Sequence, residues 1–300
     1  MEWLIVIVLV VLGLVVYGLV EPYWLDVRGI SAEIPNLPDA WQGRKLAFLS
    51  DFQVGMWLNN ERTDQRALAK VVELGVEALL FGGDFLYDDN QDVQEQINVN
   101  LRLFKPVLEA GIPIIAVFGN HDYMLDEDGG EMDDEPVERL ASQLKRAGVI
   151  VLRNELTYLE ADGEKLCVIG ADSAWAKRDD VTDILERVSA DTPRVVLIHN
   201  PSTFLKFPNH TAPFAIAGHT HGSQIHIPKV PAHRLLGVLK EDELSIRGWQ
   251  EPAAGEDGNR MYVNRGIGFS MLPVRINARP ELTIIELKRA NSREPSGSVG

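Results

Sequence analysis

The 300-residue chain has a single cysteine and many fewer basic residues than acidic ones, 29 Lys and Arg against 44 Asp and Glu. One cysteine excludes an intramolecular disulfide framework. Cys167 lies in the apolar run 166–169, which favours a buried structural thiol over a catalytic nucleophile. With a net charge of −15 and no visible basic face, the chain lacks what binding to a nucleic-acid backbone requires. We therefore expect no nucleic-acid partner.

Charge is missing altogether from residues 3–20, a stretch rich in Val, Leu and Ile between Glu2 and Glu21. Its length just suffices to cross the hydrocarbon core of a bilayer. The stretch predicts a single transmembrane anchor at residues 1–24 and hence a single-pass membrane protein. A cleaved signal peptide, which would make the protein secreted, fits less well. No Lys or Arg precedes the run, and no clear small-residue cleavage site follows it.

The first basic residues after this stretch are Arg28, Arg44 and Lys45, whereas none precedes it. Positive charge next to a membrane span favours the cytoplasmic side. This asymmetry predicts that the domain following the anchor lies on the cytoplasmic face.

The remaining chain reads as one domain, residues 25–290, followed by a polar tail at 291–300 that we expect to be disordered. Amphipathic patterns predict helices at 61–74, 93–110 and 137–147, which alternate with apolar β-favouring runs as in βαβ units. After Val149 the pattern predicts a hairpin, 156–159 with 165–169, and then a helix at 182–189. We expect an α/β fold in which two packed mixed β-sheets are flanked by helices.

Polar clusters directly follow five apolar runs, where open α/β sheets present ligands at their strand ends. The runs are 46–49, 78–81, 113–118, 195–198 and 213–217, and the clusters after them are Ser50-Asp51-Phe52-Gln53, Gly83-Asp84, Gly119-Asn120-His121-Asp122, His199-Asn200 and Gly218-His219-Thr220-His221. A lone Gly-Asp is usually a turn, but the joint order favours a metal site. Carboxylates, an amide oxygen and imidazoles suit two divalent ions such as Mn²⁺, Fe²⁺ or Zn²⁺ better than Ca²⁺.

In this order and spacing, from about Lys45 to Glu286, the motifs resemble those of the calcineurin-like metallophosphoesterases. Segments 222–224, 265–268 and 272–275 also resemble the membrane-associated branch of that family. The resemblance implies the calcineurin-like fold and assigns ligands residue by residue. Asp51, Gln53 and His221 would hold one metal, Asn120, His199 and His219 the other, and Asp84 would bridge both. His121 would act near the leaving-group oxygen, oriented by Asp122.

Gln53 departs from the resemblance, because the family's first motif normally has His at this position. An amide oxygen is a weaker donor than imidazole. Three alternatives stay open: the ion is bound more loosely, the site prefers Mn²⁺ or Mg²⁺ over Zn²⁺, or Gln53 points away and water takes its place.

Two adjacent divalent ions polarise a phosphoryl group and supply hydroxide near neutral pH. We therefore expect a phosphoesterase or pyrophosphatase acting on a phosphorylated small molecule, or on a lipid-linked substrate reached from the membrane. The alternative is a membrane-anchored binding or scaffold protein that keeps the fold but has lost activity, with Gln53 as a first sign of that loss.

The acidic segment 127–135 predicts a solvated flexible loop, or else a lid beside the site.

Overall fold

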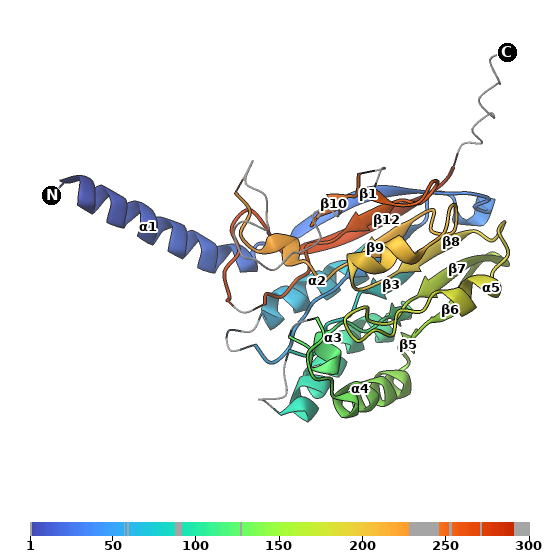
Figure 1. Ribbon diagram of the computed structural model, residues 1–300, viewed down its shortest axis with the longest axis horizontal. Coiled ribbons are helices and arrows are strands. Elements are labelled where there is room, and N and C mark those ends of the chain that lie inside the picture. The colour runs from blue at the N-terminus through green and yellow to red at the C-terminus, as the bar shows by residue number, and fades with distance from the viewer. Residues whose placement is uncertain are drawn as a thin grey trace, which may run out of the picture.

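The computed structural model describes residues 2–56, 58, 60–87, 92–126, 128–227, 246–251, 254–270 and 272–290. The predicted disordered tail, 291–300, lies outside them. Within them, two six-stranded mixed sheets pack face to face with helices on their outer sides (Figure 1), which confirms the expected fold.

The first sheet has the strand order β1-β12-β2-β3-β4-β5. Strands β2 to β5 run parallel and are joined through three helices, whereas β12 is antiparallel to β2 and parallel to β1. The bounds are β1 (Asp26–Ile34), β2 (Lys45–Leu49), α2 (Glu61–Leu74), β3 (Ala78–Phe81), α3 (Val93–Glu109), β4 (Ile114–Ala116), α4 (Asp134–Ala147), β5 (Ile150–Val151) and β12 (Glu281–Arg289).

The second sheet has the order β10-β11-β9-β8-β7-β6, with antiparallel pairs at its two edges and parallel strands between them. Its elements are β6 (Glu155–Ala161), β7 (Glu164–Gly170), α5 (Thr182–Glu186), β8 (Arg194–Leu197), β9 (Ala215–Ala217), β10 (Gly248–Trp249) and β11 (Met261–Val263). Five short 3₁₀ turns complete the described elements: η1 (Glu21–Tyr23), η2 (Asp39–Trp41), η3 (His121–Tyr123), η4 (Pro201–Lys206) and η5 (His221–Ser223).

The apolar alternation of the strands builds the core in layers. In β2, Leu46 and Phe48 join the buried cluster between the two sheets, whereas Ala47 and Leu49 join the cluster beneath α2 and α3. This is the period of two that a strand imposes, since successive side chains point to opposite faces. Both faces of the first sheet are thereby covered, and its strand ends are left to carry polar residues.

Helix ends differ from the expectation in three places. Helix α4 begins at Asp134 and not at 137, because the side chain of Asp133 caps it by accepting the backbone N–H of Glu135 at 2.9 Å. The end of the acidic segment is therefore helix, and not the flexible loop that we expected. Helix α3 ends at Glu109, one residue early, and α5 at Glu186, three residues early.

Helix α1 (Glu2–Val20) projects from the body of the protein (Figure 1), and nearly all its side chains are exposed. Among the described residues it is the one helix long and apolar enough to cross a membrane. Only its last turn contacts the domain, where Gly18 is buried.

Candidate metal centre

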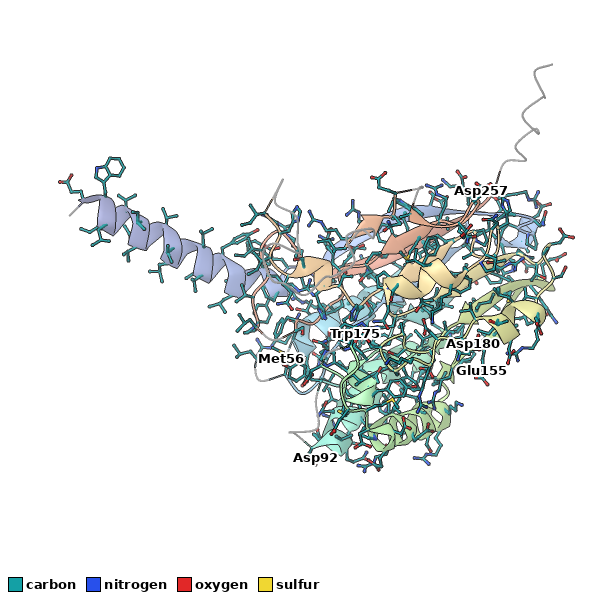
Figure 2. The ribbon with its side chains drawn as sticks, viewed as in Figure 1. Met56, Asp92, Glu155, Trp175, Asp180 and Asp257 are labelled. Carbon is teal, nitrogen blue, oxygen red and sulfur yellow. The ribbon has the colours of Figure 1, made fainter. Side chains whose placement is uncertain are left out.

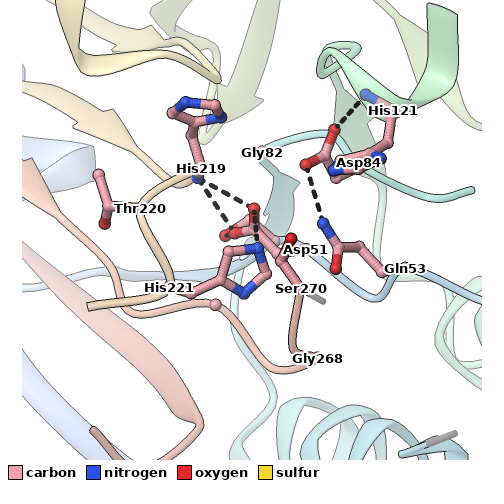
Figure 3. Close-up of polar contacts among 12 residues, drawn as sticks. Asp51, Gln53, Gly82, Asp84, His121, His219, Thr220, His221, Gly268 and Ser270 are labelled. Atoms are coloured by element: carbon pink, nitrogen blue, oxygen red, sulfur yellow. Dashed lines mark hydrogen bonds and ion pairs between the residues drawn. The ribbon is translucent and has the colours of Figure 1, made fainter. Parts of the chain in front are cut away.

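The loops that follow β2, β3, β4, β8 and β9 meet at one end of the two sheets. Backbone hydrogen bonds join them in pairs: Asp51 N–H donates to Gly83 O at 2.9 Å, and Gly218 N–H donates to His199 O at 3.1 Å. Every predicted site residue lies in this cluster, part of which Figure 3 shows. All of them are buried except His219, which is half-buried: Asp51, Gln53, Asp84, Asn120, His121, Asp122, His199 and His221.

Two groups of potential ligands share one carboxylate. Asp84, His199 and His219 form one group, and Asp51, Asp84 and His221 form the other; within each group the ligand atoms lie within 4.8 Å of one another. Asp84 is thus the carboxylate common to both groups.

In the first group, lone-pair atoms face one another. His199 Nδ1 lies 2.7 Å from Gly82 O and donates to it, so Nε2 is the nitrogen that would present a lone pair to a metal ion once its proton is lost. That Nε2 lies 3.3 Å from Asp84 Oδ2, 3.2 Å from Asn120 Oδ1 and 3.2 Å from His219 Nδ1. The Asn120 amide donates to Leu125 O at 2.7 Å, which turns its oxygen inward. Such a set of acceptors fits a cation placed between them.

In and beside the second group, two buried polar atoms have no hydrogen-bond partner among the described residues. They are His221 Nδ1 and Gln53 Oε1. The Gln53 side chain is turned into the site, with Nε2 3.4 Å from Asp84 Oδ2 (Figure 3). Asp51 is held by the backbone N–H of His219 at 3.0 Å and by the hydroxyl of Ser50. Because an unpartnered buried polar atom costs about 1–3 kcal/mol, a bound metal ion is a fitting partner for these two.

Burial sets the charge states of the imidazoles. It lowers the pKa of His219 to about 3 and that of His221 well below its usual value, so both rings are neutral, as metal ligands must be. For His199, burial acts in the same direction, but the carboxylates of Asp84 and Asp51 outweigh it and raise the pKa to about 9. The centre of the site therefore attracts positive charge.

The backbone of the site is strained. Asp51, Gln53, Asp84, His219 and His221 all have positive φ, between 46° and 70°. For residues with a side chain this conformation costs roughly 1–2 kcal/mol each and is found at functional sites, where surrounding contacts hold it. Nothing in the spacing of the motifs indicated it.

Gly119 allows the close approach of two ligands. A Cβ there would lie 2.6 Å from His199 Cε1 and 2.7 Å from Asp84 Cγ, so any larger residue would push the two side chains apart.

His121 and Asp122 depart from the expected arrangement. Asp122 does not orient the His121 ring through a hydrogen bond within the described structure. Its carboxylate instead accepts the backbone N–H groups of Asp84, Phe85, Leu86 and Gly119 at 2.9–3.1 Å, and so holds two of the site loops together. The ring of His121 is held by Tyr87, whose carbonyl oxygen lies 2.8 Å from Nδ1 and whose ring stacks on the imidazole.

Two neighbours of the site carried no predicted role. The ring of Trp175 makes an edge contact with His219, with centroids 4.7 Å apart. Arg275 is fully buried and donates to the backbone of the site loops. Arg275 lies in the segment 272–275, which resembled the membrane-associated branch of the family without suggesting a role for this residue, and Trp175 gave no signal in the motif spacing.

The chain belongs to the calcineurin-like phosphoesterase family, whose model matches residues 44–223. It is similar to the metallophosphoesterase YkuE of Bacillus subtilis, 26% identical over 272 residues that cover 90% of this chain and 88% of the relative. It is also similar to the phosphodiesterase YaeI of Escherichia coli, 28% identical over 89% of this chain and 90% of that protein. A third relative, the UDP-2,3-diacylglucosamine pyrophosphatase LpxG of Chlamydia trachomatis, is 24% identical over 88% of this chain and 90% of its own length. The chain is thus a hydrolase of the metallophosphoesterase class.

Proposed function

We propose that the protein is a two-metal phosphoesterase that hydrolyses phosphoester or pyrophosphate bonds of lipid-linked substrates at a membrane. The observation that carries this proposal is the sharing of Asp84 between two groups of metal ligands. Asp51, Gln53 and His221 would hold one ion, and Asn120, His199 and His219 the other. When bound, such a pair supplies Lewis acidity at the phosphoryl oxygens and lowers the pKa of a water.

The residues of the chain would position the ligands and transfer the proton to the leaving group. Asp84 is positioned by the backbone N–H of His121, which donates to its Oδ1 at 3.0 Å. Because His121 Nδ1 is engaged by Tyr87 O, its Nε2 is the nitrogen that can exchange a proton with the leaving-group oxygen. Asp122 keeps the loops of Asp84 and Gly119 at a fixed separation and thereby acts as a positioning residue.

Lipid-linked substrates are supported by two features. The apolar helix α1 would keep the domain at the membrane, where such molecules are concentrated. The name of one relative, a UDP-2,3-diacylglucosamine pyrophosphatase, describes action on a lipid-linked pyrophosphate. We place the domain on the cytoplasmic face because Arg28, Arg44 and Lys45 follow the helix and no basic residue precedes it.

The test uses full-length protein in detergent. We expect about two divalent ions per chain, Mn²⁺-dependent turnover of a chromogenic phosphodiester, and faster cleavage of a nucleotide–diacyl lipid pyrophosphate than of the same headgroup without acyl chains. Substoichiometric metal and no product would identify a scaffold that keeps only the fold. Equal rates on the acylated and deacylated compounds would contradict the lipid preference alone.

Proteolysis of the domain in sealed inverted vesicles, but not in intact cells, would support its location on the cytoplasmic side.

A further inference from the structure

We propose that the catalytic domain docks on the lipid bilayer through an apolar surface around the base of α1, and that α1 is fixed rigidly to this surface and not loosely tethered. We call the surface the membrane face; it comprises Tyr23, Trp24, Leu58, Ile227 and Leu272. The inference rests on α1 spanning a membrane, but not on hydrolysis.

The last turn of α1 is fixed to the segment 272–278. The N–H of Arg275 donates to Gly18 O at 2.9 Å, and a Cβ at Gly18 would lie 2.7 Å from Val274 Cγ1. One turn later, the fully buried carboxylate of Glu21 accepts the backbone N–H groups of Asn277, at 3.0 Å, and Ala278, at 2.6 Å. These contacts set the angle between the helix and the domain.

The length of α1 places this segment at the membrane boundary. The uncharged run ends at Val20 and spans about 27 Å at 1.5 Å per residue, against a hydrocarbon core of about 30 Å. The whole run is needed to cross the hydrocarbon core, so Gly18, near its end, must lie at the edge of that core. Since Val274 and Arg275 lie against Gly18, their loop lies at the same depth.

The exposed apolar side chains of the membrane face lie on segments bonded to this base. Leu272 is 58% exposed, two residues before Val274, and Ile227 is 44% exposed. Ile227 follows His226, whose N–H donates to Ile276 O at 2.8 Å. Leu58 is 40% exposed, two residues before Asn60, whose amide donates to Pro22 O at 3.0 Å. If a bilayer covers the membrane face, these apolar side chains lose their contact with water, which favours docking.

Aromatic and basic groups border the same base. Tyr23 and Trp24 follow α1 and are 38% and 43% exposed, as expected of interfacial aromatics. Arg66 donates to Tyr23 O at 2.6 Å, and the guanidinium of Arg279 lies 5.3 Å from the Trp24 ring centroid. The chain has a net charge of −15, but the guanidinium groups of Arg66 and Arg279 lie at the depth expected for lipid phosphates.

The segment bound to α1 also reaches the metal centre. Arg275 Nη1 donates to His221 O at 3.3 Å and to Arg265 O at 2.9 Å, so the residue that contacts the membrane helix through its N–H supports a ligand loop through its side chain. Docking would therefore hold the site close to the lipid headgroups.

The experiment measures how close two labelled positions of the domain lie to the surface of a lipid vesicle. Full-length L272C and D257C variants are labelled with a fluorophore, reconstituted in phosphatidylcholine–phosphatidylglycerol vesicles, and quenched by lipids that carry a nitroxide near the headgroup. Asp257 lies at the end of the domain away from α1 (Figure 2), its side chain is 83% exposed, and the native Cys167 is buried. We expect at least twofold stronger quenching at position 272. Equal quenching in protein that floats with the vesicles would overturn docking, and protein that does not float would overturn the anchor as well.

A matched pair of helix variants tests the rigid attachment. In the L272C background, Gly18→Leu would collide with Val274 and Ile276, whereas a Cβ at Gly13 meets nothing within 4 Å. We expect Gly18→Leu to reduce quenching at position 272 toward the value at 257 and Gly13→Leu to leave it unchanged. Quenching unaffected by Gly18→Leu would overturn the rigid attachment.

Discussion

The guanidinium of Arg275 donates through Nη1 to the backbone carbonyl oxygen of His221, a proposed metal ligand, at 3.3 Å. The same buried side chain donates to the carbonyl oxygens of Arg265, Gly266, Gly268 and Ala278. Burial lowers its pKa to about 9, a value at which the group is still charged near neutral pH. A single cation therefore organises the loops on one side of the site by binding their backbone, without being a ligand itself.

Replacing Arg275 should destabilise the protein. In Arg275→Met several buried carbonyl oxygens lose their donor, and we expect the free energy of unfolding to fall by about 3 kcal/mol or more. Denaturant titration of detergent-solubilised protein measures this. The control is Arg260→Met, since Arg260 is exposed and its guanidinium lies over the Trp249 ring. Equal unfolding midpoints for the two variants would contradict the role of Arg275.

The ligand loops could be predicted from the sequence because the signal is local. Each buried strand is an apolar run, and polar residues begin where the strand ends, as in Phe48-Leu49 followed by Ser50-Asp51. Parallel strands bring their carboxyl ends to one edge, so local patterns suffice to place distant residues together. Long helices such as α2 were predicted for the same reason, since their periodicity is complete within the segment.

Features that depend on distant partners could not be predicted in this way. Strand β1 pairs with β12 across more than 250 residues, from Asp26 with Glu281 to Ile34 with Arg289, and its own sequence carries charges throughout. The burial of Arg275 arises from carbonyl groups of several separate loops. Asp122 likewise resembled a histidine partner by its position, but its hydrogen bonds go to the backbone of the Asp84 loop.

Asp84→Asn should abolish activity. The variant keeps the shape of the side chain but removes the charge that would offset the repulsion between two ions, and we expect kcat/KM to fall on the order of a thousandfold, or about 4 kcal/mol of barrier. Metal content should fall as well. Asp257→Asn, at an exposed carboxylate that belongs to neither ligand group, is the control. Turnover within tenfold of the parent would exclude the bridging role.

Cys167 should be inert in the folded protein. Burial raises the pKa of its thiol to about 11, so the reactive thiolate is scarce at pH 8 and would become abundant only as the pH approaches that value. A chromogenic disulfide reagent at pH 8 should detect no fast thiol in native protein and one thiol in guanidinium chloride. Asp257→Cys supplies the positive control, because its added thiol is exposed. Rapid labelling of the parent would show that the β7 strand opens.

Gln53→His should shift the metal preference toward Zn²⁺. The Gln53 side chain is turned toward Asp84, and its oxygen has no hydrogen-bond partner within the described structure, as expected of a metal ligand. Imidazole nitrogen is a better ligand for Zn²⁺ than an amide oxygen, so the Zn²⁺ concentration for half-maximal activity should fall relative to that for Mn²⁺. Turnover itself has no predicted direction, because an ion held more tightly can also retain product. Gln42→His adds a histidine at an exposed position and should change neither value. If Gln53→His also leaves both half-saturation values unchanged, Gln53 lies outside the coordination sphere, and one ion is held by a protein ligand fewer than the family pattern implies.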